Sequence, residues 1–203
     1  MCNDYERNVT WAQYRAAMRA AGISMDERQS ELDLPQAADV RIGDMAPIAR
    51  QSGELVELAP MRFGMPPTNP RGGPVFNFRS EGRHFANSGR CLVIASAFYE
   101  FKGTSYPKTK YRFALNGVDL MAIAGIWRAG GGNQPDAFAM LTTAPSADVA
   151  PIHNRQVAVL LPETWRAWLE LSLPEPELLR PLPAGSLSVE VVRRGREGEP
   201  LLI

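Results

Sequence analysis

The sequence predicts a β-rich α+β fold, and three observations support this class. Apolar runs rich in β-branched and aromatic residues recur from residue 91 onward, as is typical of buried strands. Two other segments, near the start and near residue 165, carry apolar residues at helical spacing. The 203 residues, 45% of them hydrophobic, are enough for a sizeable core, and the composition resembles that of globular proteins. We therefore expect a single domain over residues 1–203.

The first helix is predicted shortly after the amino terminus. Thr10 and Gln13 have the spacing of a capping box, in which each side chain bonds the backbone N–H of the other residue. From Trp11 onward apolar residues recur on one helical face, and Gly22 is a typical residue to end a helix. We therefore expect a helix between Thr10 and Gly22.

The next part of the chain shows weaker patterns. Residues 24–55 are polar and mixed, and they predict only a short strand around 38–42 and another around 54–58. The segment "MPPTNPRGGP", residues 65–74, is dense in Pro and Gly and is therefore expected to be a loop.

The second half of the chain predicts mainly strands. "CLVIASAFYEF", residues 91–101, is expected to form one buried strand. Asn116-Gly117 lies between two apolar runs, which is a strong signal for a β-hairpin. Further strands are expected at 137–144 and 157–161.

A second helix and a last strand complete the predicted elements. Pro162 and Glu163 favour a helix start, because proline is tolerated in the first turn and an acidic side chain suits that end of the helix dipole. Trp165 and Trp168 lie on the apolar face of this helix. Residues 186–192 predict a strand before a charged tail.

Charge and cysteine content exclude several classes of protein. The 22 basic and 22 acidic residues give a formal net charge of +0, which argues against a non-specific nucleic-acid binder but leaves room for a local basic patch. Two cysteines do not build a disulfide framework, and the charged first residues are unlike a signal peptide. The longest apolar run is far shorter than the ~20 residues that a membrane span needs. We therefore expect a cytoplasmic protein with no membrane partner.

Cys2 is the first candidate for chemistry, because it lies directly behind the initiator methionine. Removal of Met1 would place a free α-amine and a thiol on one residue. Cys91, by contrast, lies in an apolar run and is expected to be a small core residue. Neither cysteine has the short spacing to another Cys or His that zinc sites use, so no metal site is predicted.

Four further side chains are candidates for catalysis or binding. His153, next to Arg155, suits either proton transfer near neutral pH or a structural hydrogen bond. Glu100 ends an apolar run, where burial would raise its pKa toward a useful acid–base range unless the side chain reaches solvent at the strand end. Asn77 and Arg79 are two residues apart, so an extended chain points both to one side, as in a phosphate or sugar site or in an ordinary polar face.

Five segments stand in a characteristic order, namely Cys2, "MRFGMPP", "NFRSEG", "RCLVIASAFYEF" and "TTAPSADVAPIHNRQVAVLLPE". In this order and spacing they resemble the SRAP family, the SOS response-associated peptidase or abasic-site-processing proteins. The resemblance runs over nearly the whole chain and is weakest between residues 20 and 55. It implies one domain with a barrel-like core of mixed and antiparallel strands, flanked by helices.

The resemblance also implies an activity. Members of the family bind single-stranded DNA that contains an abasic site and attach themselves covalently to it through a catalytic cysteine. Carried over motif by motif, the catalytic residues are Cys2, Asn77, Glu100 and His153, and the residues directed toward DNA are Arg62, Phe63, Arg79, Thr142 and Arg155. No cofactor is implied, and a monomer that associates with the nucleoid is expected.

The chemistry explains why such a cysteine stands at a terminus. An α-amine has a reference pKa of about 7.7–8.0, against about 10.4 for lysine, so a useful fraction is unprotonated at neutral pH. The amine forms a Schiff base with the ring-opened abasic sugar, and the thiol of the same residue closes a five-membered thiazolidine. His153 and Glu100 are the acid–base pair available for the proton transfers.

The chain departs from the common family pattern at four places, one of which is Phe101, where the family commonly has a tryptophan. Asn3-Asp4 follows the cysteine where Gly-Arg is common, and an anion there would disfavour phosphate unless Asp4 points away. Phe63 stands where Trp is common, which keeps an aromatic face but loses an indole donor. Asn154 stands where an aspartate commonly follows the histidine.

Two other functions remain open at the level of sequence. One is a cysteine or N-terminal-nucleophile peptidase, acting on its own chain, with His153 as the base. The other is a non-catalytic module that binds single-stranded DNA and in which Cys2 is incidental.

Overall fold

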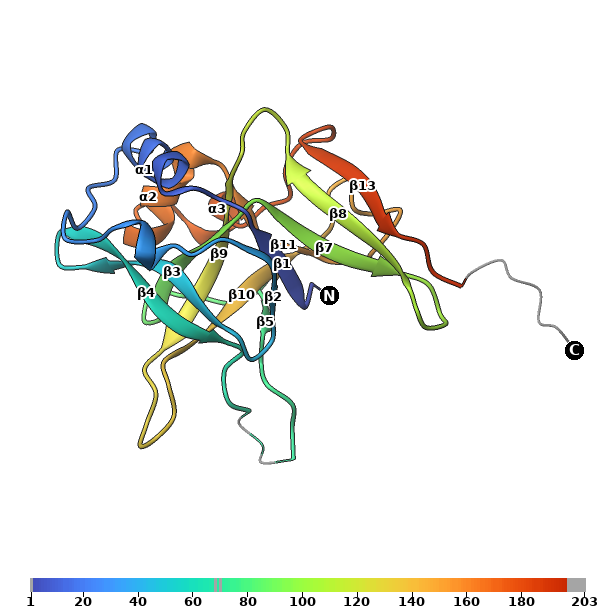
Figure 1. Cartoon of the computed structure of the whole chain (residues 1–203), viewed down its shortest axis with the longest axis horizontal. Coiled ribbons are helices and arrows are strands. Elements are labelled where there is room, and N and C mark those ends of the chain that lie inside the picture. Colours follow the sequence, from blue (N-terminus) through green and yellow to red (C-terminus); the bar gives the residue numbers. More distant parts are fainter. Residues whose placement is uncertain (1, 68, 70, 197–203) are drawn as a thin grey trace, which may run out of the picture.

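Two β-sheets form the framework of the computed structural model, which describes residues 2–67, 69 and 71–196 (Figure 1). The first sheet has five strands in the order β13-β8-β7-β1-β2. The bounds of its strands are Leu187–Arg193 for β13, Thr109–Leu115 for β8, Ala97–Lys102 for β7, Asp4–Arg7 for β1 and Ala37–Arg41 for β2. In Figure 1, β8 and β13 extend to the right as an arm, and the amino terminus lies between this arm and the second sheet.

The second sheet has eight strands and partly closes on itself. Its order is β11-β10-β4-β3-β6-β9-β12, and β5 pairs with β10 outside this path. The bounds are Gln156–Val157 for β11, Ala137–Thr143 for β10, Leu55–Phe63 for β4, Met45–Ser52 for β3, Gly89–Ala95 for β6, Met121–Arg128 for β9, Val159–Leu160 for β12 and Asn77–Arg79 for β5. Because β10 also pairs with β9, strands β10, β4, β3, β6 and β9 form a ring. The predicted barrel-like core of mixed strands is confirmed, since β10 runs parallel to β4 and β5 while the other pairs in the ring are antiparallel.

Three strands of this ring, β6, β9 and β10, are buried on both faces along most of their length, which explains the uninterrupted apolar runs in the sequence. Along β6, Cys91 and Val93 pack in one apolar cluster together with Phe138. The alternating Leu92 packs in a second cluster with Trp165. β6 therefore separates two cores from Cys91 onward, whereas β3 and β4 also carry exposed residues, among them Arg62.

The α-helices gather on one side of the molecule, at the upper left of Figure 1. The bounds are Trp11–Ala20 for α1, Pro162–Glu170 for α2 and Glu175–Leu178 for α3, and a 3-10 turn, η1, spans Glu31–Asp33. The predicted capping box is present at the start of α1, where the Thr10 hydroxyl accepts from the Gln13 N–H at 3.2 Å and the Gln13 side chain accepts from the Thr10 N–H at 2.8 Å. The second helix begins at Pro162, as predicted, and buries Trp165 and Trp168. The two shortest helical elements, α3 and η1, were not expected.

The hairpin predicted at Asn116-Gly117 is wrong. The strands on either side, β8 and β9, belong to different sheets and do not pair. The Asn116 N–H instead donates to the Ser186 carbonyl at 2.9 Å, next to the pairing of β8 with β13. Gly117 does adopt the left-handed conformation of a turn, with φ of 79°. The local turn was therefore predicted correctly, but β8 pairs with β7, which precedes it, and with β13, which lies some 70 residues further along the chain.

The single strand predicted over residues 91–101 is two strands in two sheets. β6 ends at Ala95 and β7 begins at Ala97. Between them the Ser96 N–H donates to the Glu6 carbonyl at 2.8 Å, and the Ser96 hydroxyl donates to the Glu6 carboxylate at 2.8 Å. These two bonds to β1 move the chain from the ring into the other sheet. The strand predicted at 157–161 is likewise divided, into β11 on β10 and β12 on β9.

The weakly patterned region was predicted in part. β2 confirms the strand expected around 38–42, β4 is longer than the one expected around 54–58, and β3 was not expected. The described residues of 65–74 form no helix or strand, as expected, and the last predicted strand is confirmed as β13. Met1 and the end of the charged tail lie outside the described residues.

In the part of the chain that is described, no helix has the length and apolar character to cross a membrane, and no three His, Cys, Asp or Glu side chains are grouped to hold a metal ion.

Candidate active site

Strand pairing brings Cys2 to Glu100. β1 runs antiparallel to β7, with Tyr5 opposite Phe98 and Glu6 opposite Ala97. The residues before Tyr5 therefore run beside those that follow Phe98. Cys2 is fully buried in this position, and its thiol donates to the Asp4 carbonyl at 3.1 Å.

Asn77 binds the backbone of Cys2 from the other sheet. It is the first residue of β5, which lies parallel to β10 with Asn77 opposite Met140. Its Nδ2 donates to the Cys2 carbonyl at 2.7 Å. Its Oδ1 is also buried and has no hydrogen-bond partner among the described residues. An unused acceptor therefore lies on the side chain that holds Cys2.

Glu100 and His153 form a pair of titratable groups beside Cys2. The Glu100 side chain is 1% exposed, and its Oε2 lies 3.9 Å from Nε2 of His153. The other ring nitrogen, Nδ1, lies 2.9 Å from the carbonyl oxygen and 3.1 Å from the backbone nitrogen of Arg155. The backbone of Arg155 thus fixes the imidazole with Nε2 directed toward the carboxylate. The sequence left open whether Glu100 is buried or reaches solvent at the end of its strand. The structure shows that it is buried.

Burial sets the protonation states of the three side chains. Desolvation raises the pKa of Glu100 to about 7, although the backbone N–H groups of Cys2 and Phe101 act in the opposite direction. Burial also raises the pKa of the Cys2 thiol well above its usual range, and the Glu100 carboxylate raises it further. Burial lowers the pKa of His153. Near neutral pH the site therefore holds a protonated thiol, a neutral imidazole and a carboxyl group that is partly protonated.

Thr142 and Arg155 belong to a bonded group at the end of β10. The carbonyl and the hydroxyl of Thr142 both accept from Nη2 of Arg155, at 2.7 and 3.0 Å. Glu81 binds the same guanidinium through two bonds of 2.6 and 2.8 Å. The Arg155 side chain is 12% exposed. Its guanidinium is therefore engaged within the protein and is not presented to a phosphate.

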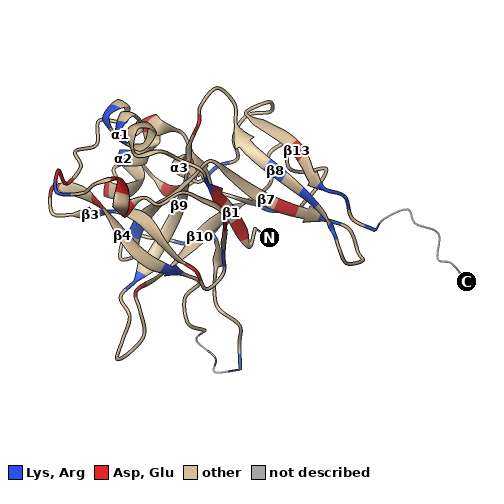
Figure 2. Cartoon of the chain, viewed as in Figure 1, with Lys and Arg blue, Asp and Glu red and all other residues tan. Residues whose placement is uncertain are grey.

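The other three residues expected to face DNA divide into one buried and two exposed side chains. Phe63 is fully buried, is stacked on Phe138 with ring centroids 5.1 Å apart, and contacts the edge of Tyr5. Its ring offers no face to a nucleobase, so the expected stacking finds no support at this position. Arg62 and Arg79 are exposed, and neither forms an ion pair with another described residue. Figure 2 shows basic residues dispersed over both sheets and α1 and interspersed with acidic ones.

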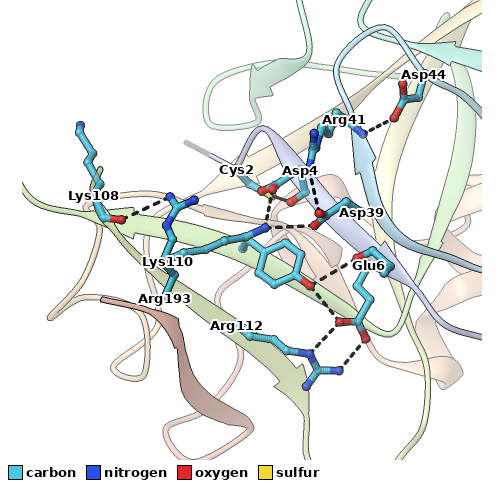
Figure 3. A network of polar contacts seen from close by, with 12 residues as sticks. Cys2, Asp4, Glu6, Asp39, Arg41, Asp44, Lys108, Lys110, Arg112 and Arg193 are labelled. Carbon is cyan, nitrogen blue, oxygen red and sulfur yellow. Dashed lines mark hydrogen bonds and ion pairs between the residues drawn. The ribbon is translucent and has the colours of Figure 1, made fainter. Parts of the chain in front are cut away.

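An ion-pair network beside Cys2 was missed from the sequence (Figure 3). Asp4 binds Lys110 at 2.8 Å, and Glu6 binds Arg112 through two bonds of 2.8 and 3.0 Å. The available signal was the spacing, since "DYER" places two acids and "KYR" two bases at alternate positions, each pair on one face of a strand. Asp4 is 7% exposed, so its carboxylate points into the protein, away from an approaching phosphate.

The sequence of this chain matches one protein-family model and is similar to two abasic site processing proteins. The family model described as SOS response associated peptidase (SRAP) matches residues 1–195. Abasic site processing protein YoqW of Bacillus subtilis (strain 168) is 34% identical over 100 residues, which are 47% of this chain and 44% of YoqW. Abasic site processing protein YobE of the same strain is 34% identical over 100 residues, 47% of this chain and 45% of YobE. The aligned segment spans just under half the length of these relatives.

Solved structures match over almost the whole chain. A protein from Bacteroides thetaiotaomicron superposes with a TM-score of 0.71 at 20% identity, covering 95% of this chain and 92% of the other. A protein from Bordetella bronchiseptica superposes with a TM-score of 0.68 at 25% identity, covering 95% of this chain and 100% of the other. The arrangement of the two sheets is thus shared with known folds.

Proposed function

The chain belongs to the SOS response-associated peptidase (SRAP) family, and from this we propose that it processes abasic sites in single-stranded DNA, as a monomer, by a covalent bond through Cys2. The two Bacillus relatives are named abasic site processing proteins, which supports the same substrate here. The observation that carries the proposal is the bond of 2.7 Å from Asn77 Nδ2 to the Cys2 carbonyl, beside Glu100 and His153. Groups from both sheets converge on the one residue that can offer an amine and a thiol together.

The α-amine of Cys2, freed by removal of Met1, is the first nucleophile. It adds to the aldehyde carbon of the ring-opened sugar, and the carbinolamine loses one water to give a Schiff base. The thiol sulfur then bonds to the imine carbon while its proton passes to the nitrogen, which closes the thiazolidine. One water leaves overall, and neither an oxidant nor a cofactor is consumed. Because both nucleophiles belong to one residue, the second step is intramolecular and fast.

The protonation states favour this order of steps. Burial and Glu100 raise the thiol pKa, so thiolate is scarce at neutral pH and the amine attacks first. Glu100, with a pKa of about 7, can give a proton to the departing hydroxyl and take one back in a later step. The unused Oδ1 of Asn77 can accept a hydrogen bond from the amine. A peptidase that attacks through its thiolate is disfavoured by the same raised thiol pKa.

Crosslinking to a defined strand tests the proposal. The protein is incubated with a single-stranded oligonucleotide that carries one abasic site, and the products are separated on a denaturing gel and weighed by intact mass spectrometry. We expect a shifted band whose mass is that of the protein without Met1 plus the strand, less one water. Cys2→Ala abolishes the band, whereas the matched control Cys91→Ala, which changes the other fully buried cysteine, retains it. Cys2→Ser keeps the amine but lacks the thiol, so its adduct appears only after borohydride reduction of the Schiff base.

Three outcomes contradict the proposal. A band that persists in Cys2→Ala without borohydride shows that the stable bond to DNA does not need the Cys2 thiol. Cleavage of a peptide in trans without labelling of DNA favours the peptidase. Equal binding of strands by wild type and Cys2→Ala, with no covalent band from protein whose first residue is Cys2, favours the non-catalytic module.

A further inference from the structure

Lys110 lies in a buried cluster of charges one strand away from the candidate active site (Figure 3). Its Nζ is 2.8 Å from Asp4 Oδ2 and 3.0 Å from Asp39 Oδ1. It also lies 3.6 Å from the centroid of the Tyr99 ring. The Lys110 and Asp4 side chains are only 13% and 10% exposed. One ammonium from β8 thus ties together β1, β2 and β7, and solvent screens the bond to Asp4 little, whereas the Asp39 side chain is 33% exposed.

Asp4 connects this cluster to Cys2. Its side chain binds Lys110, while its backbone carbonyl accepts from the Cys2 thiol at 3.1 Å. Asn77 holds the other side of Cys2, at the carbonyl. The nucleophilic residue is therefore fixed between two anchors, and the anchor on β1 is only as firm as the Asp4–Lys110 pair.

The electrostatics of Asp4 make its pairing necessary. Burial raises the pKa of Asp4, and Lys110 opposes this by hydrogen bonding and charge. The charged groups that act on the Cys2 thiol are Glu100 and Asp4, and both raise the thiol pKa. On the far side of the cluster, Asp39 also binds Arg41 at 3.0 Å. Without Lys110, a poorly solvated carboxylate would remain unneutralised beside the nucleophile.

We propose that Lys110 is a positioning residue, which holds and neutralises Asp4 so that the amine and thiol of Cys2 are placed for attack and ring closure. It touches neither the substrate nor the reacting atoms. The inference rests on the proposed function, and it assigns to Lys110 and Asp4 a role in setting both the geometry and the proton affinity of Cys2. Because Lys110 neutralises Asp4, an acidic residue can stand two positions after Cys2 without leaving an unpaired charge beside the nucleophile.

The test compares single-turnover crosslinking rates across pH 6–9 with non-covalent affinity. The affinity probe is a strand with a tetrahydrofuran site, which lacks the hydroxyl needed to open and so cannot crosslink. Lys110→Met should slow crosslinking about 10- to 100-fold, the effect of a displacement of about 1 Å, while changing affinity by less than about threefold. Its pH–rate profile should move to higher pH by about one unit, because an unpaired carboxylate favours the protonated amine and thiol.

Two further variants separate positioning from general stability. Asp4→Asn combined with Lys110→Met removes both charges, so the wild-type pH profile should return, while the rate should stay low because the pair that anchors β1 is still missing. Arg112→Met breaks the neighbouring ion pair, of Glu6, between the same two strands. It should lower stability without moving the pH profile. Should Lys110→Met alone fail to fold, the double variant, which buries no unpaired charge, carries the comparison.

The outcomes distinguish this inference from its premise. If wild type does not crosslink, the proposed function fails. If wild type crosslinks and folded Lys110→Met retains both its rate and its pH profile, the role of Lys110 is refuted while the proposed function stands. A pH shift of equal size in Arg112→Met also refutes it, since the effect would then belong to the strand and not to Asp4.

Discussion

Two glutamates on adjacent strands of one sheet are driven in opposite directions by their surroundings. Glu6 on β1 is bonded by Arg112, Ser96 and Tyr99, and these bonds, that of Arg112 above all, lower its pKa to about 2. Glu100 on β7 is nearly inaccessible to water, and desolvation raises its pKa to about 7. The same side chain is thus a structural anion at one position and a candidate proton carrier at the other.

The resemblance to the family identified residue types at the site but not their burial. Cys2, Asn77, Glu100 and His153 come together in the structure, and their catalytic roles stay predictions. Whether a side chain is open to a ligand depends on its neighbours from other strands, which a single motif does not contain. The sequence for this reason did not reveal that Phe63 is buried or that the Arg155 guanidinium is occupied by Glu81 and Thr142.

Replacing Glu100 by glutamine should make the protein relatively more stable as the pH rises. The folded-state pKa of about 7 exceeds the ordinary value of 4.5, so wild type loses stability as the pH rises from about 4.5 through 7, while Glu100→Gln does not. The shift corresponds to about 3 kcal/mol. Urea unfolding at pH 4.5 and pH 8 should show the free energy of unfolding of wild type falling by about this amount relative to the variant.

Glu6→Gln provides the control of opposite sign. The folded-state pKa of Glu6, about 2, lies below the ordinary 4.5, so its stabilising contribution is present above pH 4.5 and is lost as the pH falls toward 2. Glu6→Gln should therefore destabilise the protein at neutral pH, with a difference that vanishes in acid. Parallel pH dependences for the two variants would contradict both assignments.

At the scale of secondary-structure elements, the sequence predicted local conformation better than strand pairing. The helix starts at Thr10 and Pro162 follow from contacts within one turn and were predicted correctly. The break at Ser96 and the connection after Leu115 depend on bonds to β1 and to residue 186, which lie about 70 to 90 positions away. No local pattern contains such pairings, so the two sheets could not be separated from sequence.

Gly117→Ala should destabilise the protein by about 1 kcal/mol. The residue has a left-handed φ of 79°, which costs an L-residue conformational energy, and a Cβ at this position meets no atom within 4 Å. The cost is therefore that of the backbone alone. Gly131→Ala is the matched control, because the space around Gly131 is equally open and its φ is not left-handed. Chemical denaturation should show a loss only for Gly117→Ala, and equal losses would contradict the assignment.

At the scale of the whole molecule, closure of the ring depends on a small residue in β9. Gly125 lies opposite Cys91 of β6 and Met140 of β10, where β9 pairs on both sides. An added Cβ would lie 2.8 Å from the Cys91 sulfur and 3.2 Å from the Ala139 carbonyl. The ring therefore has no room for a larger residue at this position.

Gly125→Ala should lower the free energy of unfolding by about 1–3 kcal/mol through overpacking. Cys91→Ala removes the nearest atom, so the double variant should lose less than the sum of the two single variants. Thermal unfolding of all four proteins gives the coupling between the sites. Additive effects would show that the ring relaxes elsewhere and that the two side chains are not in competition for space.

The charge distribution of the whole molecule predicts a modest dependence of DNA binding on salt. The net charge is +0, and many cations are already paired, among them Arg112 with Glu6 and Arg155 with Glu81. Arg62 and Arg79 are exposed and are therefore available to bind phosphates.

Each phosphate contact to a single strand contributes about 0.7 to the slope of log affinity against log salt. Arg62→Gln and Arg79→Gln should therefore each weaken binding of a tetrahydrofuran-containing strand and reduce this slope by about 0.7, as measured by fluorescence anisotropy. Arg155→Gln should lower the melting temperature and leave the slope unchanged, and a reduced slope in this variant would show that Arg155 leaves Glu81 for the DNA.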